Sequence, residues 1–414
     1  MIKESKIKTL VLFAHYTDKV SYYDDWADAF SDALEFNVSR LNLYDLDSLD
    51  ALKKTISDFE LIICLHSTNA AGFKFLFPYI SVLNKRRCQL MLFFGNELNY
   101  PILGMRMQDK LHLLSVIKPD FVASQLPKES AIDLYQDSTN AEIIELPHAL
   151  NPKCFNPKIE QRDRTIDIGV RSERYLPFMG NNDRNEIIDF FESYQFHSSF
   201  NLDIGRAWKD RFSRDGWANF LNNCKGTIAT EAGSDFLEKD DQTVIAISEY
   251  VENRSETKNQ FLANRFRRVN SRYRKYLPYK TIVQMEDYLA ARKWIDNKTS
   301  YDHYYTIGFD EIFDRFYRNY ENARSGKCIS SRHFDAIGCK TCQIMFPGHF
   351  NGILEAGKHY ISLSKDFSNI SDVMAAFNDD KTRQEIVDRA YDHVFENHTY
   401  RNRMNSLLSV VDHC

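Results

Sequence analysis

The stretch that decides the fold is SSRHFDAIGCKTCQIMFPGHFNGILEAGKHYISL, residues 330–363. Its pattern predicts a helix over 332–338, a buried strand over 341–346, a glycine-bearing loop over 347–352 and a strand over 359–363. Asp335 on the helix suits a polyhydroxylated ligand, because a carboxylate accepts hydrogen bonds from paired hydroxyls. The exposed N–H groups of the loop suit phosphate. An ordinary strand–helix unit has the same spacing, so the pattern alone leaves both interpretations open.

Strand-length apolar runs alternate with amphipathic segments through the amino-terminal part of the chain. Strands are predicted at 9–14, 38–43, 61–66, 89–94, 121–124 and 142–146, and helices at 22–34, 49–57, 72–83, 105–116 and 129–135. Such alternation predicts a parallel, doubly wound sheet with right-handed crossovers.

Polar residues follow three of these strands. Ligands of doubly wound sheets bind beyond the carboxyl ends of the strands. That edge holds His15 after the first strand, His66 after the third, and Gly95-Asn96-Glu97 after the fourth. Each alone is explained by a local hydrogen bond in a loop. Glu97 is the best candidate for a base or for a ligand of an acceptor hydroxyl, because a carboxylate can do either.

A second alternation begins after a proline-rich boundary. Three prolines between 146 and 157 end the first domain, and His148 there either faces a cleft or packs in the hinge. Strands are predicted at 165–170, 200–204 and 226–230, and helices at 185–194, 216–222, 371–377, 382–396 and 400–411. We therefore predict an amino-terminal domain over 1–150, a linker over 151–164, a second domain over 165–390 and a final helix over 391–414.

The alternation fails between about 240 and 325, where long amphipathic helices are predicted as an insertion. Basic residues interleaved with aromatic rings gather between Arg265 and Lys280. This composition fits contact with a polyanionic acceptor, an anionic membrane surface or nucleic acid. A solvated helix face, partly neutralised by Glu249, Glu252 and Glu256, explains it too.

Bulk properties narrow the class of protein. The chain has 414 residues, long enough for two domains, with 43% hydrophobic and 27% charged residues. Its formal net charge of −5 argues against a general affinity for nucleic acid. The first ten residues lead straight into a strand, and no apolar run reaches the roughly 20 residues of a membrane span. We expect a cytoplasmic protein, peripheral to the inner face of the membrane if it contacts lipid.

Cys339 and Cys342 form the CxxC pair of a chain with eight cysteines. No second pair accompanies them, and they lie where a helix passes into a strand. Zinc binding would need further ligands, and thioredoxin-like chemistry needs the pair at the amino terminus of a helix. A structural role for the two cysteines is therefore favoured.

Several of these motifs resemble the group 1 glycosyltransferases, and most closely a subgroup found with bacterial surface-polysaccharide synthesis. The similarity rests on 332–338, Gly348-His-Phe-Asn-Gly352, 359–369, the ending His398-Thr-Tyr-Arg401, the Gly-Asn-Glu motif at 95–97, Ser124–Pro127 and the connector at 146–157. The resemblance implies a GT-B fold, in which two Rossmann-like domains face a central cleft, and a retaining reaction. It places Asp335 on the ribose of a nucleotide sugar, where Glu is usual, with Arg332 beside it. Lys327 stands where many members carry a second Glu.

The resemblance also implies roles for other residues. Arg171, with Arg174, would bind the donor diphosphate, since guanidinium groups pair with phosphate oxygens. The loop residues Gly348, His349 and Asn351 would lie beside the phosphates or the donor sugar. Glu231, in the segment 230–235, either faces the same cleft or belongs to a solvated turn. Glu97, with His15 or His66, would line the acceptor side.

The sequence therefore predicts a hexosyltransferase-type glycosyltransferase of capsule or lipopolysaccharide synthesis. It would move a sugar from a nucleotide donor to a hydroxyl of a saccharide or lipid-linked saccharide. No metal or other cofactor is expected, since no DxD motif lies in a suitable loop. The alternatives are a GT-B sugar-nucleotide epimerase, a polyol-phosphate transferase, and a degenerate binding or scaffold subunit, which Lys327 and Asp335 in place of Glu would favour.

Overall fold

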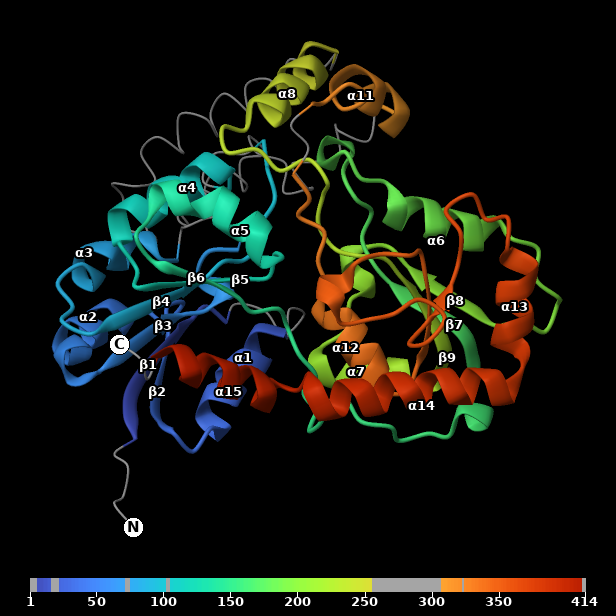
Figure 1. The fold of residues 1–414 in the computed structure, drawn as a ribbon, viewed down its shortest axis with the longest axis horizontal. Helices are drawn as coiled ribbons and strands as arrows, with labels where there is room; N and C mark the ends of the chain where they lie inside the picture. Colours follow the sequence, from blue (N-terminus) through green and yellow to red (C-terminus); the bar gives the residue numbers. More distant parts are fainter. Residues whose placement is uncertain are drawn as a thin grey trace.

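A computed structural model describes residues 6–15, 22–70, 75–101, 105–254, 307–321 and 324–411. They form two parallel sheets, each in its own domain (Figure 1). The first sheet has the order β2-β1-β3-β4-β5-β6, and the second has the order β11-β10-β9-β7-β8. The prediction of two doubly wound α/β domains is confirmed.

The strands of the first sheet are β1 (Ile7–Phe13), β2 (Phe36–Asn42), β3 (Leu61–Cys64), β4 (Gln89–Phe93), β5 (Phe121–Ser124) and β6 (Glu142–Glu145). Those of the second are β7 (Ile166–Arg171), β8 (Leu202–Gly205), β9 (Cys224–Ala229), β10 (Cys342–Met345) and β11 (Ile361–Ser362). The central strands β3 and β10 are buried along their whole length. Continuous apolar runs of this kind occur where helices cover both faces of a parallel sheet.

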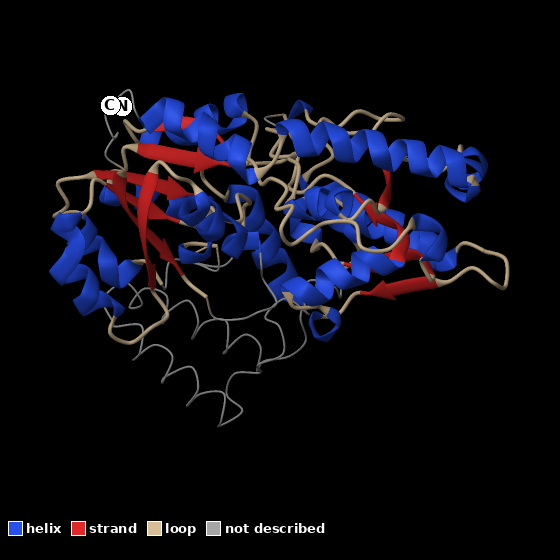
Figure 2. Cartoon of the chain, turned by 90° about the horizontal axis from the view of Figure 1, so that it is seen from below, coloured by secondary structure: helices blue, strands red, loops and turns tan. Residues whose placement is uncertain are grey.

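Helices cover both faces of each sheet (Figure 2). On one face of the first sheet pack α2 (Ser48–Thr55), α3 (Ile80–Leu83), α4 (Met107–Ile117) and α5 (Lys128–Tyr135). Its other face packs against α1 (Tyr22–Asp32) and α15 (Tyr400–Val411). The second sheet lies between α6 (Asp183–Ser193) with α13 (Ile370–Asn378) and α7 (Arg214–Asn223) with α12 (Ser331–Gly338), and α14 (Asp380–Asn397) contributes to both cores.

The chain crosses between the domains twice at one end of the interface. Residues 146–165 run from β6 to β7, and α15 returns from α14 to the first domain (Figure 1). The two crossings are hydrogen-bonded: Leu150 N donates to His398 O at 2.9 Å, and Tyr400 N donates to Leu150 O at 3.1 Å. Tyr400, Met404 and Leu407 are buried in the core of the first domain.

The inserted segment contributes α8 (Gln242–Arg254) and α11 (Phe309–Phe316), which lie side by side above the two domains (Figure 1). They share a small core with Phe178 and Tyr317. The basic and aromatic stretch from Arg265 to Lys280 lies outside the described residues. Within the described ranges, no helix combines the length and apolarity needed to cross a membrane.

Residues at the start of this insertion attach it to the first domain. Asp241, with no exposed surface, accepts hydrogen bonds from the backbone N–H groups of Met107 (3.0 Å) and Gln108 (2.8 Å) at the start of α4. Asn99 donates to Asp241 at 2.6 Å and exchanges two hydrogen bonds with the backbone of Glu238. A carboxylate from the second half of the chain thus caps a helix of the first domain, where unpaired N–H groups favour negative charge.

One predicted helix differs from the structure. The pattern at 72–83 predicts a continuous helix, whereas the described part is a 3₁₀ turn at Phe77–Tyr79 followed by the single turn of α3. Pro78 explains the difference, because proline is tolerated in a first turn but not in a helix interior.

We expect Asp241→Ala to lower the free energy of unfolding by about 2–3 kcal/mol, because it leaves buried N–H groups of α4 without an acceptor. Urea unfolding followed by circular dichroism measures the change. Asp240→Ala is the matched control, since Asp240 is exposed and, among the described residues, its carboxylate accepts a hydrogen bond only from Gln242 N, at 3.3 Å. Equal stability of the two variants would contradict the capping role.

Candidate functional site

A cavity opens at the carboxyl ends of β7 and β9, where parallel sheets bind ligands. Helices α6, α7 and α12 complete its wall. Its polar lining residues are Arg171, Ser172, Arg184, Trp217, Thr227, Thr230, Arg332, His333 and Gln343. All of them belong to the second domain.

The charged side chains of this cavity are guanidinium groups. No carboxylate among the described residues pairs with Arg184, which packs on the ring of Tyr175 at 3.7 Å from its centroid. Burial, together with the nearby cations Arg332 and Arg211, lowers the pKa of Arg184 to about 9. It therefore stays charged at neutral pH. Crowded, half-buried cations of this kind favour an anionic ligand.

Arg171 is held more tightly than Arg184. Its guanidinium bonds to the Asp203 carboxylate at 2.9 Å and lies 4.2 Å from the centroid of the Phe220 ring. Arg174 is more exposed and pairs with Asp189, at 2.9 Å. The structure thus places Arg171 with Arg184 and Arg332 in the cavity lining, whereas Arg174 is not part of that lining.

Asp335 is buried on α12, with 6% of its surface exposed. Trp217 Nε1 donates to its Oδ2 at 3.0 Å. Burial raises the pKa of Asp335 to about 7, although the Trp217 hydrogen bond and the charges of Arg332 and Arg214 oppose this rise. Asp335 does not itself line the cavity, whereas Trp217 does.

The loop after β10 contacts Glu231 of its own domain and the ends of β5 and β6 in the first domain. Phe350 N donates to Glu231 Oε1 at 2.6 Å, so Glu231 lies against this loop, and its carboxylate leaves no space for a Cβ atom at Gly348. Asn351, at φ +54°, donates to Gln125 O (3.1 Å) and Glu145 Oε1 (2.7 Å) of the first domain. Asn351 therefore joins the domains, while His349 is exposed.

Glu97 is engaged within the first domain. Its carboxylate accepts hydrogen bonds from Ser124 Oγ (2.6 Å), Gln125 N (2.8 Å) and Tyr135 OH (2.9 Å). Burial raises its pKa despite these bonds. Lys110, also buried, donates to the carbonyls of Gly95 and Asn96. In this arrangement Glu97 fixes the loop after β4.

Three of the histidines that the sequence singles out, His15, His66 and His148, differ in burial and in their partners. His66 and His148 are buried and stacked, with ring centroids 5.0 Å apart, and Trp26 Nε1 donates to His148 Nδ1 at 3.1 Å. Burial lowers the pKa of both, to about 3 for His148, so both are neutral. His148 packs in the hinge. His15 is partly exposed, and its Nδ1 lies 3.4 Å from Asp24 Oδ1.

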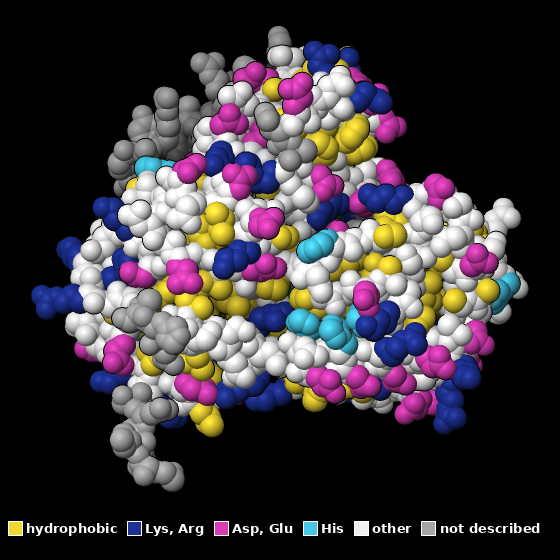
Figure 3. Space-filling model, viewed as in Figure 1, with side chains coloured by type: hydrophobic (Ala, Val, Ile, Leu, Met, Phe, Trp, Pro, Cys, Tyr) yellow, Lys and Arg dark blue, Asp and Glu magenta, His cyan; other side chains and the backbone are white. Residues whose placement is uncertain are grey.

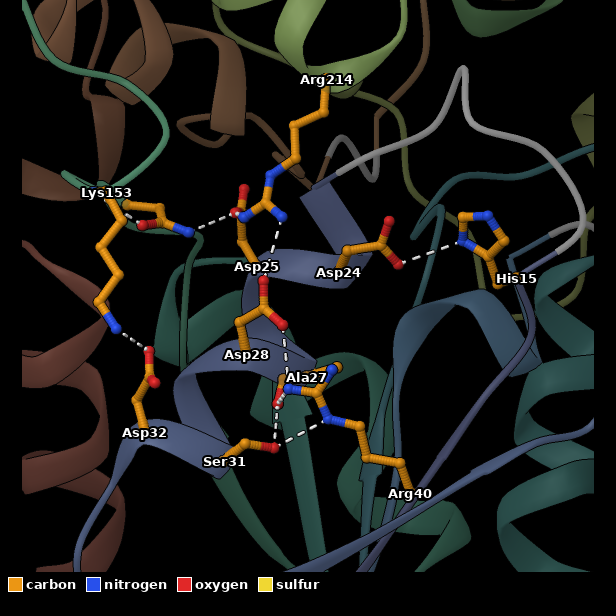
Figure 4. A network of polar contacts seen from close by, with 11 residues as sticks. His15, Asp24, Asp25, Ala27, Asp28, Ser31, Asp32, Arg40, Lys153 and Arg214 are labelled. Carbon is orange, nitrogen blue, oxygen red and sulfur yellow. Dashed lines mark hydrogen bonds and ion pairs between the residues drawn. The ribbon is translucent and has the colours of Figure 1, made fainter.

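Acidic residues of α1 meet basic residues of the second domain and the linker (Figure 4). Arg214 pairs with the buried Asp25 and, at 3.0 Å, with Asp28. Asn151 donates to Asp25 at 2.7 Å, and Lys153 pairs with Asp32 at 2.7 Å. On the face drawn in Figure 3, basic and histidine side chains gather along the junction of the two domains.

Lys327 and the CxxC pair also have defined surroundings in the structure. Lys327 donates to Asp183 at 2.8 Å and lies 3.8 Å from Asp235. Cys339 and Cys342 are buried free thiols, as a structural role for the CxxC pair requires.

Sequence analysis missed Arg184, Trp217 and Asp24. Each lies on a helix, where a single charged or aromatic residue is usually a solvated or core residue. The position of Arg184 in the first turn of α6, the α-helix that follows β7, was the available signal.

Comparisons with known proteins agree with this architecture. Residues 290–409 match a family model described as glycosyl transferase-like. No curated protein sequence matches the chain. An alpha-glucosyltransferase solved with UDP-glucose and DNA containing an abasic site has a TM-score of 0.53 and 9% identity, with 99% of this chain and 100% of that one covered.

Two other solved structures are more distant. HepE from Anabaena, in complex with UDP and glucose, has a TM-score of 0.47 and 9% identity, covering 99% of this chain and all of that one. Sucrose-phosphate synthase from Thermosynechococcus elongatus has a TM-score of 0.47 and 10% identity, covering 99% of each chain. The likeness to the alpha-glucosyltransferase identifies the fold as GT-B.

The raised pKa of Asp335 predicts a pH dependence of stability. Between the ordinary carboxyl pKa of 3.8 and about 7, the folded state keeps a proton that the unfolded state has lost, so stability falls as pH rises through this window. At about 1.4 kcal/mol per pKa unit, the loss is at most about 4 kcal/mol. We expect Asp335→Asn to lose less stability than the wild type between pH 5 and pH 8 in thermal unfolding. An identical loss in both proteins would contradict the assignment.

Proposed function

We propose that this protein is a glycosyltransferase that moves a sugar from a nucleotide-sugar donor to a hydroxyl of a saccharide. The observation that carries the proposal is the cavity of the second domain. It combines the guanidinium groups of Arg171, Arg184 and Arg332 with the ring of Trp217 at the edge of the sheet where ligands bind. Cations suit a diphosphate, and a flat ring suits a nucleoside.

The reaction follows from that ligand. The acceptor oxygen bonds to the anomeric carbon of the donor, the bond from that carbon to the diphosphate oxygen breaks, and the hydroxyl proton passes to a base on the acceptor side. Charge develops on the leaving diphosphate, where preorganised guanidinium groups stabilise it in place of a metal ion. In this proposal the loop at 348–351 lies beside the donor, and Asp335 acts at the nucleoside end of the ligand.

The first domain would hold the acceptor. Among its candidate residues, His15 has the setting of a base, because it is partly exposed and faces Asp24. His66 and Glu97 are buried and engaged with other residues, which suits a supporting role.

The biological setting belongs to the proposal as well. The motif resemblance supports synthesis of bacterial capsule or lipopolysaccharide on a saccharide or lipid-linked acceptor. A cytoplasmic protein at the inner face of the membrane would meet both substrates there.

A second candidate is a subunit that binds a nucleotide sugar without turning it over. The observation that favours this second candidate is that the Glu97 carboxylate accepts three hydrogen bonds within its own domain. Binding without transfer to any acceptor would select this candidate.

Nucleotide binding is the first test. A thermal-shift screen against UDP, GDP, CMP, dTDP and their sugars should show stabilisation by one nucleotide, because a ligand of the native state raises the unfolding temperature. We expect Arg184→Gln to weaken that binding about tenfold, since it removes a cation that has no acidic partner among the described residues. Arg389→Gln, on an exposed face of α14, is the control. No stabilisation by any nucleotide would contradict the proposal.

Metal independence is tested separately. With the stabilising nucleotide sugar and a saccharide acceptor, we expect product formation to persist in EDTA and not to rise on addition of Mg²⁺ or Mn²⁺. Loss of product in EDTA, restored by a divalent ion, would show that a metal supports the leaving diphosphate.

A further inference from the structure

We propose that Trp217 is the nucleoside-binding side chain of the cavity and that Asp335 acts through it, as a positioning residue that fixes the plane of the indole. This inference rests on the proposed function and assigns the part of the site that holds the base. It differs from direct binding of the ribose by Asp335.

The arrangement of the two side chains is the first argument. Trp217 lines the cavity and is partly exposed, whereas Asp335 is 6% exposed and is not a lining residue. The indole N–H points to Asp335, with Nε1 3.0 Å from Oδ2. The carboxylate therefore lies at the N–H edge of the indole, outside the lining of the cavity.

The packing of the ring is the second argument. Trp217 stacks on Phe220, with centroids 5.7 Å apart and planes 21° apart. The guanidinium of Arg171 lies on the ring of Phe220, at 4.2 Å from its centroid. The buried Phe220 ring thus packs against both the indole and the guanidinium, and these two groups line the cavity. Held at its N–H and supported by this stack, the indole has one orientation.

The set of groups that lines the cavity matches a nucleoside diphosphate. The aromatic ring of Trp217 and the cations Arg171, Arg184 and Arg332 line the same cavity. An aromatic ring stacks on any base, and guanidinium groups bind phosphate. A ligand with a flat ring joined to a diphosphate satisfies both parts.

A double-mutant cycle tests the inference. The probe is whichever of UDP, GDP, CMP and dTDP stabilises the wild type most, with affinity measured by calorimetry. We expect Trp217→Ala to weaken binding at least about tenfold, since stacking on the base is lost. Asp335→Leu should weaken it as well, and Asp335→Asn should recover most of that loss, because its amide oxygen still accepts the indole N–H.

The double variant Trp217→Ala/Asp335→Leu decides between the two roles of Asp335. If Asp335 acts only through Trp217, the double variant binds as weakly as Trp217→Ala alone. If Asp335 contacts the ribose itself, the two losses multiply, and the inference is overturned. A wild type that binds none of the four nucleotides overturns the proposed function itself.

Fluorescence supplies a readout that a purely structural role would not change. The chain has four tryptophans, and stacking of a base on Trp217 should alter its emission when the nucleotide binds. We expect the change to disappear in Trp217→Phe and to persist in Trp26→Phe. Trp26 is the matched control, because its N–H also donates to a buried partner, His148 Nδ1 at 3.1 Å. Persistence of the change in Trp217→Phe would count against the inference.

Discussion

Buried carboxylates at the interface fix the two sheets relative to each other. Asp25 is 2% exposed and meets Arg214 and Asn151 near the hinge, while Asp241 has no exposed surface and caps α4 beneath the insertion. A buried carboxylate without partners costs several kcal/mol, so each one requires the opposite domain to stay in place. These contacts, together with the linker, therefore determine how the two sheets are placed relative to each other.

Much of the fold could be predicted because periodicity reports burial. Strands such as β3 and β4 are short apolar runs between turn residues, and their alternation with helices determines a parallel sheet. The prediction of a continuous helix at 72–83 was wrong, because Pro78 interrupts a segment whose apolar periodicity is helical. The anchoring of the insertion by Asp241 could not be predicted, because Asp241 lies more than 130 residues from its partners in α4.

The site was predicted in part, for a physical reason. Parallel topology places the carboxyl ends of the strands on one edge, so Arg171 could be located from its strand alone. What a side chain does there depends on partners from other elements. Glu97 has the expected place, yet Ser124, Gln125 and Tyr135 occupy its carboxylate. Arg184 and Trp217 gain their setting only when α6 and α7 pack beside β7, which no local pattern reports.

The anchored interface constrains how the site can work. The lining residues of the cavity all belong to the second domain, so its wall does not depend on the position of the first domain. A large rotation between the domains would have to break the hydrogen bonds of Asp241 at one end or the pairing of Asp25 with Arg214 at the other. Ligand contacts would have to offset that cost. Trp217 and Arg184, by contrast, lie within the second domain, so their side chains can adjust without breaking either of these contacts.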